Sequence, residues 1–207
     1  MATASRKISR RMGRPRNKDV DRRILTAAIE LFVRAGWQDF VIEEVARRAR
    51  VGKASIYLRW SDREALLRDA LLAFFTPWPV VPTGSFREEL QALVRAVLSE
   101  LSADIGWSIS RVQSDPDIPA GIAQLCRGLI AERVAVVERL VESAKQRGEI
   151  PADAPTRLIM ETVTGAALGH AGLARYSEPA PHGRDDPDDF ARTLVDFLYP
   201  AFCRSSG

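Results

Sequence analysis

Apolar residues recur every three to four positions through most of the chain, which is the period of an α-helix with one buried face. No segment shows the strict alternation of apolar and polar residues that a half-buried strand would have. The pattern therefore predicts an all-α fold with about nine helices.

Near the N-terminus the pattern predicts one long helix and then two short ones. The long helix covers about residues 20–35, and Gly36 is placed to end it in a left-handed conformation. The short helices cover Ile42–Ala49 and Lys53–Trp60, with Arg50, Val51 and Gly52 as a tight turn between them. Two short helices joined in this way form a helix-turn-helix.

A proline-rich segment divides the chain after the fourth predicted helix. Ser61 and Glu64 have the spacing of a capping box, which starts that helix, and it ends before Pro77. Two further prolines follow at positions 79 and 82, and prolines remove backbone donors and fix the backbone. Beyond this seam, a second capping box at Ser85 and Glu88 opens the first of five helical segments, at about residues 85–101, 107–115, 119–147, 155–176 and 187–201.

Charge is distributed unevenly between the two sides of the chain. Residues 1–60 hold 15 Lys and Arg against 6 Asp and Glu, whereas residues 61–207 hold 15 against 21. A basic module joined to a longer, mildly acidic one suggests that the first part binds a polyanion, with nucleic acid as the first candidate. No apolar run is long enough to span a membrane and no secretion signal is evident, so we expect a cytoplasmic protein whose two cysteines, Cys126 and Cys203, are reduced.

The stretch from Ile24 to Leu67 resembles the DNA-binding region of the TetR family of bacterial transcriptional regulators. The strongest elements are Leu31-Phe32, Gly36, Val45-Ala46, the run from Val51 to Tyr57, and Trp60. Three positions depart from the usual pattern: Val41 replaces a Thr or Ser cap, Arg50 replaces a Gly, and Arg63 replaces a Lys. The resemblance implies a basic arm at residues 1–19, a DNA-binding domain at 20–66 and a ligand-binding and dimerisation domain at 67–207.

The second short helix has the small, polar and basic residues that a helix needs to approach base edges in a major groove. Lys53, Ala54 and Ser55 supply them, and Tyr57 and Arg63 suit phosphate contacts. Tyr57 has a second interpretation as a half-buried ring that covers Leu31 or Phe32. Two further arginines, on the preceding helix, either lie beside the duplex or are ordinary solvated charges: Arg47 and Arg48.

The first eighteen residues carry seven basic side chains and almost no apolar ones, so we expect this arm to be disordered without a partner. Its Gly13-Arg14-Pro15-Arg16 tract resembles short hooks that lay arginines such as Arg14 and Arg16 along a narrow minor groove. The alternative is a tail that only increases solubility.

The acidic part offers no catalytic or metal-binding pattern. His170 and His182 lack metal-ligand spacing, and neither a P-loop nor a Gly-x-Ser-x-Gly motif is present. The family resemblance implies that this part forms a dimer, and the sequence offers small and apolar residues for a four-helix seam. These residues are Gly165, Gly169, Gly172, Phe190, Leu194, Phe197, Leu198 and Ala201, and the alternative is that they pack within one chain.

The resemblance also implies an effector cavity in the acidic part. Six apolar residues lie on helices that line this cavity in similar proteins, and each could equally be plain core: Phe74, Phe75, Val94, Trp107, Leu129 and Met160. The sequence therefore favours a homodimeric repressor that binds a double-stranded DNA operator, responds to a small apolar effector, and needs no metal or cofactor. Two alternatives stay open: a regulator with a vestigial cavity that answers to a protein partner, and an all-α enzyme or scaffold with a basic arm.

Overall fold

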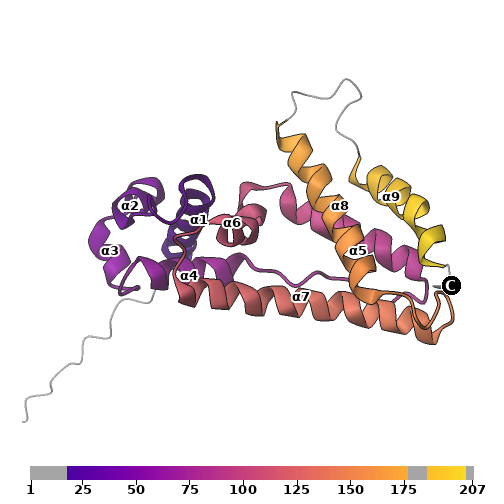
Figure 1. Cartoon of the computed structure of the whole chain (residues 1–207). Coiled ribbons are helices and arrows are strands. Elements are labelled where there is room, and N and C mark those ends of the chain that lie inside the picture. Colours follow the sequence, from indigo (N-terminus) through magenta and orange to yellow (C-terminus); the bar gives the residue numbers. More distant parts are fainter. Residues whose placement is uncertain (1–17, 177–185, 204–207) are drawn as a thin grey trace, which may run out of the picture.

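The structure is a computed structural model that describes residues 18–176 and 186–203. Within these residues it contains nine α-helices, one 3-10 helix and no strand (Figure 1). The elements are α1 (Lys18–Ala35), α2 (Ile42–Ala49), α3 (Lys53–Tyr57), α4 (Arg63–Phe74), α5 (Phe86–Leu101), η1 (Asp104–Trp107), α6 (Ser108–Ser114), α7 (Ala120–Gln146), α8 (Thr156–Tyr176) and α9 (Pro187–Phe202). The predicted all-α fold is confirmed.

Side-chain caps begin α4, α5 and α9, and two of the predicted helix ends differ in the structure. Ser85 caps α5, since its hydroxyl accepts a bond from the Glu88 amide at 3.4 Å. The cap of α4 is Asp62 rather than the predicted Ser61, because the Asp62 carboxylate accepts from the Ala65 amide at 2.8 Å. α3 ends at Tyr57 instead of Trp60, and Trp60 is a buried anchor whose indole donates to Asp69 at 2.8 Å.

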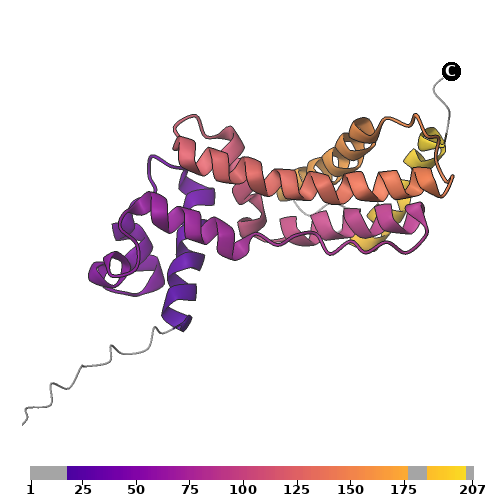
Figure 2. The same ribbon diagram turned by 90° about the horizontal axis from the view of Figure 1, so that it is seen from below.

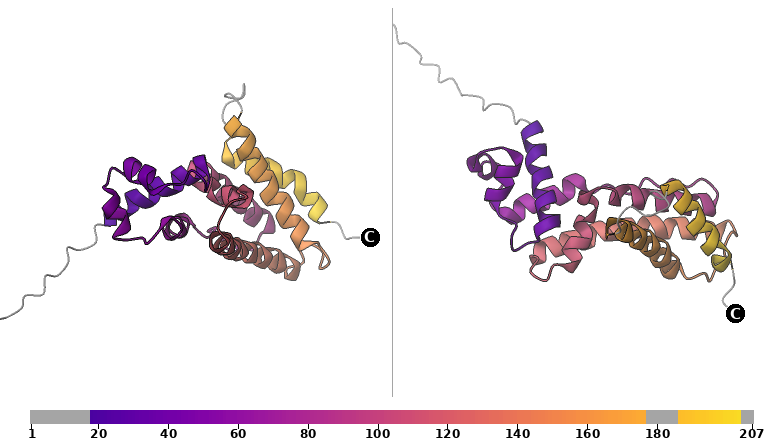
Figure 3. Two further views of the ribbon diagram at one scale, coloured as in Figure 1. Left: turned by 60° about the vertical axis from the view of Figure 1, so that its left-hand side comes forward. Right: turned by 90° about the horizontal axis from the view of Figure 1, so that it is seen from above.

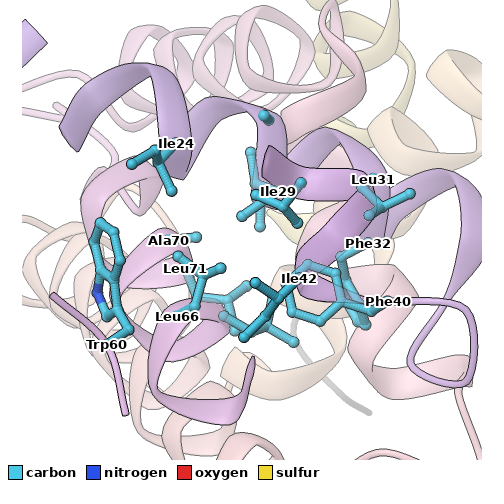
Figure 4. Packing of buried hydrophobic residues seen from close by; sticks show 14 of the residues in the cluster. Ile24, Ile29, Leu31, Phe32, Phe40, Ile42, Trp60, Leu66, Ala70 and Leu71 are labelled. Atoms are coloured by element: carbon cyan, nitrogen blue, oxygen red, sulfur yellow. The ribbon is translucent and has the colours of Figure 1, made fainter. Parts of the chain in front are cut away.

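The N-terminal helices α1 to α4 pack around one apolar core (Figure 4). Ile24 and Phe32 of α1, Ile56 of α3 and Leu66 of α4 are completely buried in it. Three residues from beyond the proline-rich seam join the same core: Val112, Ile122 and Cys126. The N-terminal helix-turn-helix module is therefore built directly onto α6 and the first turns of α7.

The C-terminal helices form a second core around α5. Residues of α5 such as Leu90, Leu93 and Val94 are fully buried against α7, α8 and α9. α5 runs beside the long α7 (Figure 2), and α8 and α9 lie side by side at the end of the molecule away from α2 and α3 (Figure 3). None of the described helices is long and apolar enough to cross a membrane.

Candidate nucleic-acid interface and ligand cavity

The outward face of α3 holds the residues predicted to meet DNA. Ile56 is fully buried and fixes the helix on the core, whereas Lys53 and Ala54 are exposed and Ser55 is partly buried. Tyr57 exposes 52% of its surface, which leaves the ring accessible to a partner. The structure thus presents all four predicted residues on one short helix, and their contacts with bases and phosphates stay predictions.

Two glutamates of α2 pair with three of the predicted DNA-binding cations, a feature that the sequence analysis missed. Glu44 accepts bonds from Arg47 at 2.6 Å and from Arg48 at 2.8 Å, and Glu43 forms an ion pair with Lys53. The bonds from Arg47 and then Arg48 lower the pKa of Glu44 to about 2. The spacing of three and four residues along a helix was the available signal for the Glu44 pairs.

Arg63 makes contacts within the protein at the position where the sequence predicted a phosphate contact. Its guanidinium lies 4.1 Å from the ring centroid of Trp37 and donates to the carbonyl oxygens of Trp37 at 3.1 Å and Phe40 at 3.2 Å. In this structure Arg63 therefore ties the loop between α1 and α2 to the start of α4. Its phosphate contact stays a prediction.

The other two departures from the family pattern also have a structural place. Arg50 ends α2 with a φ of 54°, in the left-handed region where glycine is usual, and its amide bonds to the Arg47 carbonyl at 3.3 Å. Val41 occupies the N-cap of α2 and makes no side-chain cap bond. Arg14 and Arg16 of the predicted minor-groove hook lie outside the described residues.

Two adjoining cavities have volumes of about 430 and 470 Å³: the first lies between α4 and the α5–α7 helices, and the second lies within the α5–α8 bundle. The first is lined by Phe74, Phe75 and the proline-rich segment from Thr76 to Pro79, together with residues of α5, η1 and α6. The second extends to α7 and α8 and includes Met160 in its wall. Five residues line both cavities: Trp78, Glu100, Gly106, Ile109 and Arg133.

Three of the six predicted lining residues do not line either cavity. Val94 is completely buried in the core around α5, and Leu129 is also buried. Trp107 packs against the same core, and its indole donates to the Leu101 carbonyl at 3.1 Å. Helical periodicity identifies an apolar face, but it does not distinguish a face that meets another helix from one that meets a cavity.

The polar centre of the cavities is an ion pair that the sequence analysis did not find. Arg133 Nη2 donates to Glu100 Oε1 at 2.8 Å, and Trp78 Nε1 donates to Glu100 Oε2 at 2.8 Å. The Arg133 guanidinium also lies 4.5 Å from the Phe75 centroid and 4.9 Å from that of Trp78. No short-range pattern links these residues, since Glu100 and Arg133 are 33 positions apart.

The predicted dimer residues fall into two groups. Gly165, Gly169, Phe197 and Ala201 are exposed on α8 and α9, and Phe197 exposes 81% of its surface. The second group packs on the core around α5 and consists of Phe190, Leu194 and Leu198. The Phe190 ring stacks on the His170 ring, with 3.7 Å between the two ring centroids. Gly172 lies against the Trp107 ring. The first group is the more exposed of the two, the second is partly buried, and the dimer contacts of both groups stay predictions.

Comparisons with known proteins agree with this arrangement. The family model described as "Bacterial regulatory proteins, tetR family" matches residues 24–70, and the model described as "Tetracyclin repressor-like, C-terminal domain" matches residues 80–198. The transcriptional regulator AqdR of Rhodococcus erythropolis is 30% identical over 148 residues, covering 69% of this chain and 70% of AqdR. The helix-turn-helix regulator YdeS of Bacillus subtilis is 26% identical over 155 residues, covering 74% of this chain and 78% of YdeS.

Solved structures show the same fold. FadR of Bacillus subtilis, in complex with stearoyl-CoA, superposes with a TM-score of 0.65 at 15% identity and covers 86% of this chain and 97% of FadR. With a helix-turn-helix on one core, a helical domain on the other, and family matches over both, this chain belongs to the TetR family and is a DNA-binding transcriptional regulator.

Proposed function

We propose that this regulator is a homodimeric repressor and that a small apolar ligand releases it from its operator. The observation that carries the proposal is the position of the cavities, whose walls include elements that also hold the DNA-binding module. A ligand that changes these walls has a direct mechanical route to α1 and α4.

The first route runs through η1 and α6. Ala103, Ile105 and Gly106 line a cavity, and Asp104 between them pairs with Arg34 of α1 at 2.9 Å and with Arg175 of α8 at 2.8 Å. At the other end of α6, the Asp115 carboxylate accepts from the Trp37 amide at 2.8 Å. Displacement of η1 and α6 by a ligand would therefore displace α1 and the loop after it.

The second route runs through α4. Leu71 and Phe74 of this helix line the first cavity, while Leu66 and Leu67 at its other end belong to the DNA-binding core. In a dimer, the two recognition helices must lie about 34–36 Å apart to enter successive major grooves. A small rotation of α4 in each subunit changes this distance and lowers affinity for the operator.

The size of the effect follows from linkage. A ligand releases DNA only if it binds the released form more tightly, and a coupling of about 1–3 kcal/mol corresponds to roughly 5–150-fold weaker DNA binding. FadR of Bacillus subtilis, whose structure holds stearoyl-CoA, is an example of a ligand bound within this fold. For the present chain, the cavities of about 430 and 470 Å³ are in the size range of small-molecule sites.

The DNA-binding part of the proposal is tested by selecting bound duplexes from a random pool and then measuring variants on the selected operator. Lys53→Ala and Tyr57→Phe should weaken operator binding without changing helicity or dimerisation, with Lys53 affecting sequence preference and Tyr57 overall affinity. Arg139→Ala, which removes an exposed cation from α7, is the matched control. Parental affinity in both α3 variants would show that α3 is not the recognition helix.

The basic arm is tested by deleting residues 1–17. We propose that Arg14 and Arg16 contact the minor groove, so the deletion should weaken binding and reduce the slope of log affinity against log salt by up to several units. An unchanged salt dependence would show that the arm only increases solubility.

A further inference from the structure

Arg133, Glu100 and Trp78 form a polar cluster in which some donors and acceptors have partners and one donor has none. Both oxygens of Glu100 are occupied, one by Arg133 and the other by the Trp78 indole. The hydrogen bonds of the guanidinium run from Nη2, to Glu100 and at 3.4 Å to the Thr76 carbonyl. Arg133 Nε is buried and finds no acceptor among the described residues. The cluster therefore has an unpaired donor, whereas each oxygen of Glu100 already accepts one hydrogen bond.

A buried donor without a partner costs free energy that a ligand can recover. Such a group has lost its bonds to water on burial and has gained none from the protein. Arg133 exposes only 12% of its side chain, so water has limited access to it. Arg133 lines both cavities, and because Nε itself has almost no accessible surface, an acceptor in either cavity reaches this atom through a small shift of the Arg133 side chain. An unpaired donor at this place favours ligands that carry a hydrogen-bond acceptor over ligands that carry none.

The charges around the cavities determine which kind of acceptor fits. Arg133 is the only cation among the residues lining either cavity, and Glu100 already balances it. The second cavity also has Glu161 in its wall. A carboxylate on Nε would lie close to Glu100 in a poorly solvated site, where repulsion between like charges is strong. A neutral oxygen such as a carbonyl accepts the same bond without this repulsion.

The remaining walls favour an apolar body on the ligand. Phe75 and Trp78 flank the guanidinium, and Phe74, Ile105 and Ile109 extend the apolar surface of the first cavity. We propose that Arg133 is the polar anchor of the effector site and that Glu100, by holding its charge, selects an apolar ligand with a neutral carbonyl over the matching carboxylate. The inference rests on the effector cavity proposed above and specifies its ligand class.

Three aromatic probes of the same size test the selection: 4-butylacetophenone, 4-butylbenzoate and the matching hydrocarbon 1-butyl-4-isopropylbenzene, called butylbenzene below. Their dissociation constants would be measured by isothermal titration calorimetry on the full chain without DNA, with quenching of tryptophan fluorescence as a second readout. We expect the parent protein to bind the ketone about five to ten times more tightly than butylbenzene, the gain of one recovered hydrogen bond, and the benzoate most weakly.

Glu100→Gln tests the part played by charge. The amide oxygen still accepts a bond, but Arg133 is then no longer neutralised, so the benzoate should gain at least tenfold relative to the ketone. Glu100→Gln/Arg133→Met removes the donor without leaving a buried carboxylate unpaired, and it should bind the ketone and butylbenzene equally. Arg139→Met removes an exposed arginine from the same helix and should keep the parental order. Circular dichroism and thermal unfolding would verify that each variant is folded.

Several results would overturn the proposal. It fails if none of the probes binds the parent, if the parent prefers the benzoate, or if Glu100→Gln leaves the order unchanged. Because these measurements contain no DNA, their outcome is separate from that of the proposed repressor function. Ketone binding in the predicted order with no effect on operator affinity would reject ligand release of DNA and leave the anchor intact.

Discussion

Glu44 lies between two arginines that are candidates for DNA contact, and its ionisation decides whether they are paired. Hydrogen bonds from Arg47 and Arg48 lower its pKa from 4.5 to about 2. A lowered pKa in the folded state means that the pairs contribute above about pH 4.5 and are lost as the pH falls toward 2. Across pH 5–8 the carboxylate stays ionised, so a phosphate contact by Arg47 or Arg48 would require the arginine to leave Glu44.

Glu44→Gln should therefore strengthen sequence-independent DNA binding severalfold at low salt. The two arginines would meet phosphate without first losing an ionic partner, and the slope of log affinity against log salt should steepen by about one to two units. Fluorescence anisotropy with a duplex lacking the operator, over a series of salt concentrations, measures both quantities. Glu138→Gln on α7 is the control. A parental slope in Glu44→Gln would place both arginines away from the duplex.

Arg63 differs from these cations because the structure gives it a role in stability. Arg63→Met removes the bonds to the carbonyls of Trp37 and Phe40, so the free energy of unfolding should fall by about 1–3 kcal/mol. Urea denaturation without DNA measures this loss. Arg68→Met, at an exposed position of the same helix, should unfold like the parent. Equal stability of the two variants would leave phosphate binding as the sole role of Arg63.

At the scale of elements, η1 is the piece that joins the cavity wall to both halves of the chain. The hydrogen bonds from Arg34 lower the pKa of Asp104 most, and the positive charge of Arg175 lowers it further. The carboxylate of Asp104 is therefore ionised at neutral pH. Asp104→Asn should weaken both pairs and reduce the effect of a bound ligand on operator affinity severalfold, while ligand affinity itself changes little. The operator dissociation constant with and without saturating ligand measures this coupling, and Asp153→Asn is the control. Undiminished coupling would favour the route through α4.

The positions of the helices were largely predictable because strong local sequence signals mark where many of them begin and end. α7 begins after Pro119 and ends before Gly148, which has a φ of 74°, and both residues act through their own backbone. The start of α4 was wrong by one residue because Ser61 and Asp62 are both competent caps. Local sequence does not decide between them, whereas the bonds from Arg63 to the preceding loop fix where the helix begins.

The sites were less predictable because their partners are distant in sequence. Phe190, Leu194 and Leu198 form a clear apolar stripe, but nothing local shows that α5 rather than a second subunit covers it. An arginine in a long amphipathic helix normally indicates a solvated face. Arg133 is buried only because Glu100 and Trp78 arrive from two other segments.

At the scale of the whole molecule, the exposed face of α8 and α9 sets the expected oligomeric state. Phe197 is a large apolar residue that is 81% exposed, and Phe197→Asp replaces it with a charged one. The substitution should shift the protein from dimer to monomer and weaken operator binding at least tenfold. Sedimentation velocity measures the assembly. Val81→Asp, on the exposed linker before α5, should leave the dimer unchanged. A dimeric Phe197→Asp protein would move the interface to another face.

The core shared by α7 and the DNA-binding module contains a thiol whose labelling rate reports how often that core opens. Cys126 is buried in that core, and burial raises the pKa of its thiol to about 11, so a thiol reagent reacts with it at pH 8 only when the core opens. Cys203 is exposed and supplies an early, separate labelling phase. If ligand parts the module from α7, the slow phase will accelerate when ligand is added. If α7 and the DNA-binding module move together as one rigid body, labelling of Cys126 will keep its original rate while DNA is still released.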